Sequence, residues 1–255
     1  MDDLRNLLNG AAEFNRHESK PVKPLLERLA REGQSPDALF ITCADSRIDP
    51  NLIMQAQPGD LFILRNIGNL VPVIGSADAS VMATVEYAIG ALGVNTIVVC
   101  GHSDCGAMKA VISNKDLTTM PHAKQWLANA DKSVEEYNLG HNQVNFHGDL
   151  PEHDCLSQVN VVTQFENLIT YPVVRDGIAN ESLRLVGMWF DIANAKVEVY
   201  DAQKRAFVPV DTDEVMYHKT HPRTAIASTL GSAIACAAWD GCFDAALTAA
   251  TMMTI

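Results

Sequence analysis

Two short segments of this chain carry residue types that can hold a metal ion. The first is CADSR at 43–47 and the second is GHSDCG at 101–106. Two thiolates and an imidazole, from Cys43, Cys105 and His102, match the sulfur and nitrogen ligands that zinc takes in a tetrahedral site. The His-x-x-Cys spacing alone is a weak signal, because a buried cysteine and a capping histidine would also produce it. Together with the first segment, it favours one shared metal site.

The number of ligands indicates what such a site would do. Structural zinc sites usually have four cysteine or histidine ligands, commonly in paired short motifs. This chain offers one pair and one distant cysteine. Three protein ligands leave a position for water, which is the catalytic arrangement. Zinc lowers the pKa of bound water from about 15.7 to about 7, so that hydroxide becomes available as a nucleophile near neutral pH.

Asp45 and Arg47 follow directly on the first candidate ligand. As a surface ion pair they would contribute only about 0–1 kcal/mol. Beside a metal, the planar guanidinium of Arg47 can hold both carboxylate oxygens and fix their direction. Asp45 could then accept a hydrogen bond from zinc-bound water or coordinate zinc itself, and the sequence leaves both roles open.

The two segments need strands that end side by side. Apolar runs at 38–42, 60–66 and 95–101 predict buried strands, and the first and third end at the two motifs. In open parallel sheets, ligands bind at the carboxyl ends of the strands. Strands that alternate with helices predict an α/β fold with a mostly parallel central sheet and flanking helices. The expected helices cover 77–93, 104–112, 121–138, 156–169 and 172–178, and two further strands lie within 183–201.

The two ends of the chain differ from this pattern. Residues 1–32 carry two helical patterns, the second starting at Val22 with Pro24 in its first turn, and predict an N-terminal helical arm. The catalytic domain is expected over 33–210. Residues 211–255 become rich in alanine and contain no recognisable chemistry. This extension could be an extra helix packed on the body or a docking segment for another protein, with a possible apolar face of Ile234, Trp239, Phe243 and Leu247.

Composition narrows the class of protein. Acidic residues outnumber basic ones by 31 to 19, and the net charge of −12 argues against a nucleic-acid partner. No stretch reaches the roughly 18 apolar residues of a membrane span. The N-terminus is acidic and amphipathic, unlike a secretory signal. We therefore expect a cytoplasmic protein, or one inside an assembly built in the cytosol, that acts on a small substrate.

These motifs together resemble those of the beta-class carbonic anhydrases. CADSR, RNIGN, EYA and GHSDCGAM occur in order within residues 30–200. The resemblance implies an obligate dimer or larger homo-oligomer with its active site at the subunit interface, and an arm that packs on a partner subunit. It implies one Zn²⁺ per subunit on Cys43, His102 and Cys105. The implied reaction is the reversible hydration of CO2 to bicarbonate and a proton by zinc-bound hydroxide, with Asp45 and Arg47 as the orienting pair.

The same resemblance implies a substrate cleft. Gly106 matches a residue whose backbone N–H can face the substrate. GQSP at 33–36 is similar to the plant-type branch, in which the glutamine, here Gln34, donates a hydrogen bond from the partner subunit. Phe62, Ile67 and Tyr87 match apolar positions beside CO2. Without the resemblance, Gln34 would be interpreted as a solvated turn residue and the other three as core.

Two departures from the family pattern stand out. Ala44 replaces a common serine, and the tail beyond 210 is similar to the extended C-termini of carboxysomal members. Another branch of the family closes the zinc with the aspartate and holds a regulatory bicarbonate near an early tryptophan. The first tryptophan here is Trp126, so we do not expect that arrangement.

Two other functions stay open at this point. A carbonyl sulfide or carbon disulfide hydrolase of the same family would act on substrates that are also linear and electrophilic. A zinc-stabilised assembly module with little turnover would recruit a partner through 211–255, although such a module needs neither CADSR nor Gln34. The proton shuttle is not identifiable among the candidate histidines, which are His17, His122, His141, His147 and His153.

Overall fold

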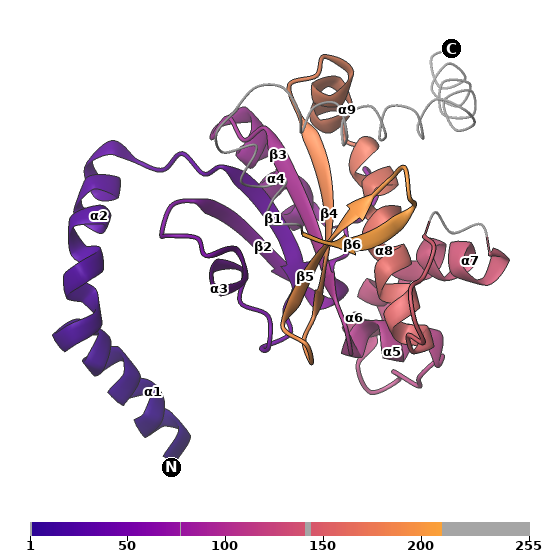
Figure 1. The fold of residues 1–255 in the computed structure, drawn as a ribbon, viewed down its shortest axis with the longest axis horizontal. Helices are drawn as coiled ribbons and strands as arrows, with labels where there is room; N and C mark the ends of the chain where they lie inside the picture. The colour runs from indigo at the N-terminus through magenta and orange to yellow at the C-terminus, as the bar shows by residue number, and fades with distance from the viewer. Residues whose placement is uncertain (1, 77, 141–143, 211–255) are drawn as a thin grey trace.

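A six-stranded sheet lies at the centre of the protein in the computed structural model, which describes residues 2–76, 78–140 and 144–210 (Figure 1). The strand order is β2-β1-β3-β4-β5-β6. Pairing is parallel from β2 through β4 and antiparallel from β4 to β6. The expected α/β fold with a mostly parallel sheet is therefore confirmed. The strands are β1 (Ala38–Cys43), β2 (Leu61–Asn66), β3 (Thr96–His102), β4 (Arg184–Asp191), β5 (Lys196–Asp201) and β6 (Ala206–Pro209).

Helices connect the strands and cover the sheet. The longest, α8, packs on β3 and β4. Its neighbours α5 and α7 pack against it, and short 3₁₀ turns precede α4 and separate α6 from α7. The elements are α3 (Pro50–Met54), η2 (Ile67–Asn69), α4 (Ala79–Gly90), α5 (Gly106–Ile112), α6 (Pro121–Leu127), η3 (Ala128–Ala130), α7 (Asp131–Leu139), α8 (Glu152–Ile169) and α9 (Pro172–Ala179).

The two faces of the sheet are covered unequally. One face forms the main core with α4, α8 and α9, where Leu39, Val99 and Phe165 are buried. The other face carries a smaller buried group around Phe40, with several half-buried apolar side chains beside it. β1 is buried at every position, as a central strand of a parallel sheet should be.

Two glycines allow α8 to lie close to the sheet. A Cβ atom added to Gly101 would lie 2.8 Å from Cγ2 of Val161, and one added to Gly187 would lie 3.2 Å from Cγ1 of the same valine. Any larger residue at these two positions would therefore push α8 outward. The polar side chains on this helix depend on the close approach, because they bond to groups of the sheet and its loops.

An N-terminal helical arm extends away from the sheet (Figure 1). It consists of α1 (Asp2–Glu13), a π-helical turn η1 (Phe14–Glu18) and α2 (Ser19–Glu32). The prediction of helices in 1–32 is confirmed, but the predicted start of the second helix at Val22 is wrong. The wider π turn joins the two helices without a break, so Pro24 lies inside α2 and not in its first turn.

Other sequence predictions need correction in detail. The helix expected over 121–138 is divided by η3, and neither α3 nor β6 is predicted by the sequence. The prediction of two strands in 183–201 is confirmed: they are β4 and β5, which pair as an antiparallel hairpin. No helix among the described residues has the length and apolar character needed to cross a membrane. The extension 211–255 lies outside the described residues.

Candidate metal centre

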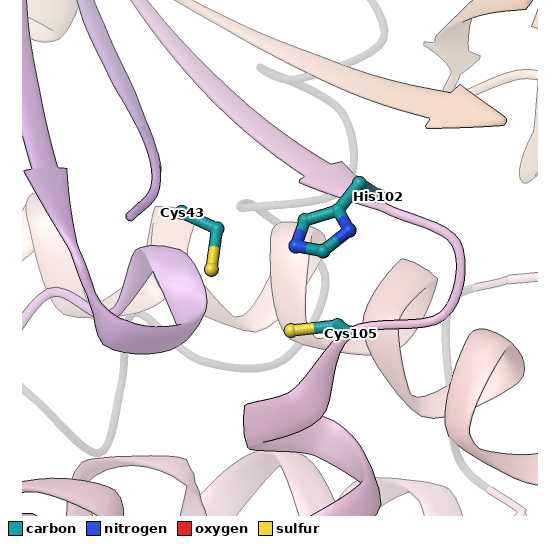
Figure 2. A group of neighbouring side chains, drawn as sticks. All are labelled: Cys43, His102 and Cys105. Carbon is teal, nitrogen blue, oxygen red and sulfur yellow. The ribbon is translucent and has the colours of Figure 1, made fainter. Parts of the chain in front are cut away.

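Three side chains from two strand ends converge at the carboxyl edge of the sheet. Cys43 is the last residue of β1 and His102 the last of β3, while Cys105 precedes α5 directly. β1 and β3 are neighbours and parallel, which brings both strand ends to the same edge. The ligand atoms of the three residues all lie within 4.8 Å of one another, and Figure 2 shows the side chains pointing toward a common space. The prediction that these two loops come together at one place in the fold is therefore confirmed.

His102 is oriented as metal-ligating histidines usually are. Its Nδ1 donates to the backbone carbonyl of Ser103 at 2.8 Å, so Nε2 carries the lone pair. Nε2 is buried and has no hydrogen-bond partner among the described residues. A buried polar atom without a partner is costly. A metal ion would satisfy this nitrogen, and a carbonyl that fixes the opposite ring nitrogen is the usual support for such a ligand.

The two cysteines also suit a metal ion. The backbone N–H of Gly68 donates to Sγ of Cys43 at 3.4 Å. A hydrogen bond from Cys105 is the largest factor that lowers the pKa of Cys43, whereas the same contact and burial raise the pKa of Cys105. The pair therefore favours one thiolate over two, since a second buried negative charge needs a nearby cation. Soft sulfur ligands combined with one imidazole fit zinc.

Asp45 and Arg47 form a two-pronged ion pair beside this group. Arg47 donates from Nε to Oδ1 at 3.0 Å and from a terminal nitrogen to Oδ2 at 2.8 Å, and its backbone N–H also reaches Oδ1. The guanidinium holds the pKa of the Asp45 carboxyl far below its usual range. Asp45 thus stays a charged acceptor with a fixed direction.

The sequence does not predict the role of Asp104, which holds Arg47 from the opposite side. Its carboxylate accepts from Arg47 at 2.7 Å and also pairs with Lys109, and its backbone carbonyl accepts from Arg47 at 3.1 Å. Lys109 and then Arg47 lower the pKa of Asp104 to about 2. The backbone φ of 59° at Asp104 allows its carboxylate and its carbonyl to contact Arg47 together. The buried Asp154 accepts the backbone N–H of Asp104 at 2.7 Å.

A third strand end supports the site as well. Arg65 of β2 donates to the carbonyls of Cys43 at 3.1 Å and Asp45 at 2.6 Å, which fixes the backbone of the first loop. Gly68 in η2 supplies the N–H to Cys43. A sequence signal exists for both residues: RNIGN follows the predicted strand 60–66 just as the two motifs follow theirs.

The five predicted substrate residues do not all lie at the metal group of one chain. Ile67 lies at the carboxyl end of β2 and is exposed, and Gly106 begins α5 with open space beside its Cα. Phe62 pairs in register with Leu39 near the other end of the strands, and its ring lies 6.0 Å from that of the exposed Tyr87. Gln34, the fifth, precedes β1 and is exposed.

Comparison with known proteins bears on the same residues. A family model described as carbonic anhydrase matches residues 38–197, which includes all three candidate ligands. A carbonic anhydrase of Pseudomonas aeruginosa is 38% identical over 225 residues, covering 88% of this chain and all of the relative.

Solved structures agree with this match. The beta-carbonic anhydrase CcaA superimposes with a TM-score of 0.76 at 34% identity, covering 83% of this chain and 94% of CcaA. One of two tetrameric beta-carbonic anhydrases from Sordaria macrospora gives a TM-score of 0.66 at 28% identity, covering 78% of this chain and 97% of that one.

Proposed function

The chain belongs to the beta-class carbonic anhydrases, and from this premise we propose that it hydrates CO2 reversibly on a zinc ion held by Cys43, His102 and Cys105. The observation that carries the proposal is the buried, unpartnered Nε2 of His102 facing two cysteine sulfurs. When bound, zinc lowers the pKa of water at its open position toward neutral and so supplies a nucleophile at pH 7.

Asp45 would orient that nucleophile. Arg47 bonds both of its oxygens, twice at Oδ1 and once at Oδ2, so Oδ2 keeps room for one more hydrogen bond. Its low pKa keeps it an acceptor only. By accepting a hydrogen bond from the attacking hydroxide, Asp45 would turn a lone pair of that hydroxide toward the carbon of CO2. The engagement of both oxygens by Arg47 supports this acceptor role over coordination of the metal.

A second copy of the chain would complete the substrate cleft. Gln34 precedes β1 and Cys43 is its last residue, and a strand of six residues spans about 17–20 Å. Gln34 of one chain therefore cannot reach the metal group of the same chain. Phe62 and Tyr87 lie toward the same distant end. We propose that these three residues serve the site of a partner subunit, while Ile67 and the N–H of Gly106 serve their own.

The deciding assay is CO2 hydration by purified, zinc-loaded protein, with carbonyl sulfide measured beside it. We expect rapid hydration of CO2 and slow or no release of hydrogen sulfide. Carbonyl sulfide turnover that exceeds CO2 hydration would replace the proposed substrate with the alternative one. Zinc binding without either activity would favour an assembly module instead.

Cys43→Ser and Cys105→Ser should each lose zinc and activity together, because a neutral hydroxyl is a far poorer ligand than a thiolate. Elemental analysis and CO2 hydration on the same preparations measure both effects. Cys155→Ser is the matched control, since Cys155 is also buried but lies outside the metal group. Full zinc occupancy in the Cys43 and Cys105 variants would exclude these residues as ligands.

A further inference from the structure

A cavity separate from the metal group lies between the start of α8 and the hairpins formed by β4, β5 and β6. Its volume is about 170 Å³, and its walls include His147, Gln158, Trp189, Asp191 and Glu198. None of these is a candidate metal ligand. For comparison, an apolar cavity of about 150 Å³ is large enough to admit benzene. This cavity therefore has room for a ligand of a few heavy atoms.

Gln158 is the unusual wall residue. It is only 4% exposed and lines the cavity, and no hydrogen bond joins its carboxamide to another described residue, although its amide atoms are not fully enclosed. Its neighbours on the same polar face of α8, such as Ser157 and Asn160, are all bonded. A polar side chain this deeply buried usually has a hydrogen-bond partner within the protein. A ligand in the cavity would supply the missing partner.

Two carboxylates share the cavity, and neither has an ion-pair partner. Within the described part of the chain, no lysine, arginine or histidine nitrogen lies within 4.0 Å of Asp191 or Glu198. Asp191 accepts hydrogen bonds from Asn194, whereas Glu198 accepts none from a described residue. Burial and then the charge of Asp191 raise the pKa of Glu198, against smaller opposing effects of His147 and Lys196. The cavity thus holds negative charge that a cation would stabilise.

The geometry distinguishes between kinds of cation. In the described ranges, only Cys43, His102 and Cys105 bring three ligand atoms within 4.8 Å of one another. His147, Asp191 and Glu198 surround the cavity without converging on a single point, which a bare metal ion would require. An anion would be repelled by both carboxylates. A small organic cation can span the cavity and reach separate polar groups.

We propose that this cavity binds a small organic cation with a primary ammonium group, which pairs with Glu198 and shares a hydrogen bond with Gln158. The ammonium offers three donors, enough for the Glu198 carboxylate and the carbonyl oxygen of Gln158. The apolar part of the ligand would lie against Trp189 and Phe207. This site is independent of the metal group and of the proposed reaction, so either can fail without the other.

Trp189 provides a direct readout of binding. It lines the cavity, and its indole N–H donates to Ser157 at 3.2 Å. The chain has three tryptophans, so fluorine NMR of the full chain labelled with 5-fluorotryptophan is simple to assign with a Trp189→Phe variant. Ethylammonium is titrated at constant ionic strength beside ethanol, a neutral molecule of similar size. We expect a saturable shift of the Trp189 signal with ethylammonium and little change with ethanol.

Two cavity variants test the assignment of residues. Glu198→Gln should weaken ethylammonium binding about ten- to hundredfold, the loss expected for a charge-assisted hydrogen bond. Gln158→Leu should weaken it about tenfold. Glu135→Gln, a change of the same kind on the exposed face of α7, should leave the affinity unaltered. The proposal is overturned if the wild-type signal shows no saturable shift, if ethanol shifts it equally, or if Glu198→Gln binds as tightly as the wild type.

Discussion

Arg47 connects the two loops of the candidate metal centre at the scale of single residues. Its guanidinium donates to the carboxylates of Asp45 and Asp104 and to the backbone of Asp104. Because Asp45 follows one metal ligand and Asp104 lies between the other two, the side chain fixes both loops at once. The side chain of Arg47 is 43% exposed, so its ion pairs add little to stability. Their role is to fix the direction of the two carboxylates.

Asp45→Asn should fold normally and retain metal while CO2 hydration falls by about 10²-fold or more, because the neutral amide loses the charged, two-pronged contact with Arg47 that directs the acceptor oxygen. Arg47→Lys should also impair turnover, since a point charge cannot make the planar two-pronged contact. Stopped-flow hydration and metal analysis separate the two effects. Near-normal turnover in Asp45→Asn would show that the pair has only a structural role.

Gly68 is a second residue on which the site depends. Its φ of 79° favours glycine, and an added Cβ would lie 3.0 Å from the Cβ of Ala107. Gly68→Ala should therefore reduce the free energy of unfolding by about 2–3 kcal/mol and weaken metal retention through the displaced N–H. Gly75→Ala is the control that carries backbone strain without crowding. The φ of Gly75 is also positive, at 83°, but an added Cβ would have no atom within 4 Å. We expect Gly75→Ala to reduce the free energy of unfolding by about 1 kcal/mol, measured by urea unfolding. Equal losses in the Gly68 and Gly75 variants would contradict the argument that Gly68 is also crowded.

At the scale of elements, α8 is the support of the centre. Ser157 donates to the carbonyl of His102 at 2.9 Å, and Asn160 donates to that of Gly68 at 3.1 Å. Gln164 and Asn167 bond to both backbone groups of Val71. One buried polar face of a helix thus holds the β3 end and the loop after β2 in register.

Ser157→Ala should reduce the free energy of unfolding by about 1–3 kcal/mol, because it leaves the His102 carbonyl and the Trp189 N–H buried without their partner. Ser113→Ala is the control, as its hydroxyl bonds the Lys109 carbonyl at an exposed site, and its effect should stay within about 0.5 kcal/mol. Urea unfolding measures both. Equal effects would mean that the bond to His102 contributes nothing specific.

The sequence predicts the central strands and the ligands for the same reason. Continuous apolar runs mark buried parallel strands, and the chemistry lies where those runs end. α3 has only five residues, too few for a periodic pattern, although Asp49 before Pro50 is a readable start signal, since its side chain accepts two backbone N–H groups. β6 depends on pairing Phe207 with Tyr200 in three dimensions. The contact of Asp104 with Arg47 depends on backbone torsion, which no pattern of residue types predicts.

At the scale of the whole molecule, the described residues of one chain leave two apolar surfaces at least partly exposed. The arm exposes Leu4, Leu7 and Leu8, and one sheet face leaves Met188 and Phe190 half-buried. A second copy that exchanged arms would cover both surfaces and deliver Gln34 to the partner's cleft. This arrangement, and the expected location in the cytoplasm or a carboxysome, stay predictions from the sequence.

Truncation after residue 210 should retain zinc and turnover per site but lose a higher-order contact, either between dimers or with another protein. The sheet ends with β6, and every candidate ligand and cleft residue precedes that point. Light scattering and CO2 hydration on one preparation test this. An inactive or unfolded product would place the extension 211–255 within the catalytic domain.

The depth of the three candidate metal ligands has a consequence for exchange kinetics. His102 and Cys105 are 0% exposed and Cys43 is 6% exposed, so a chelator in solution cannot touch them in the folded chain. A bound ion would then be released through a local opening of the loops that carry these ligands. Its residence time would then follow the rate of that local opening and would stop depending on chelator concentration once capture outpaces reclosing. The protein would hold its metal by slow release as much as by tight binding.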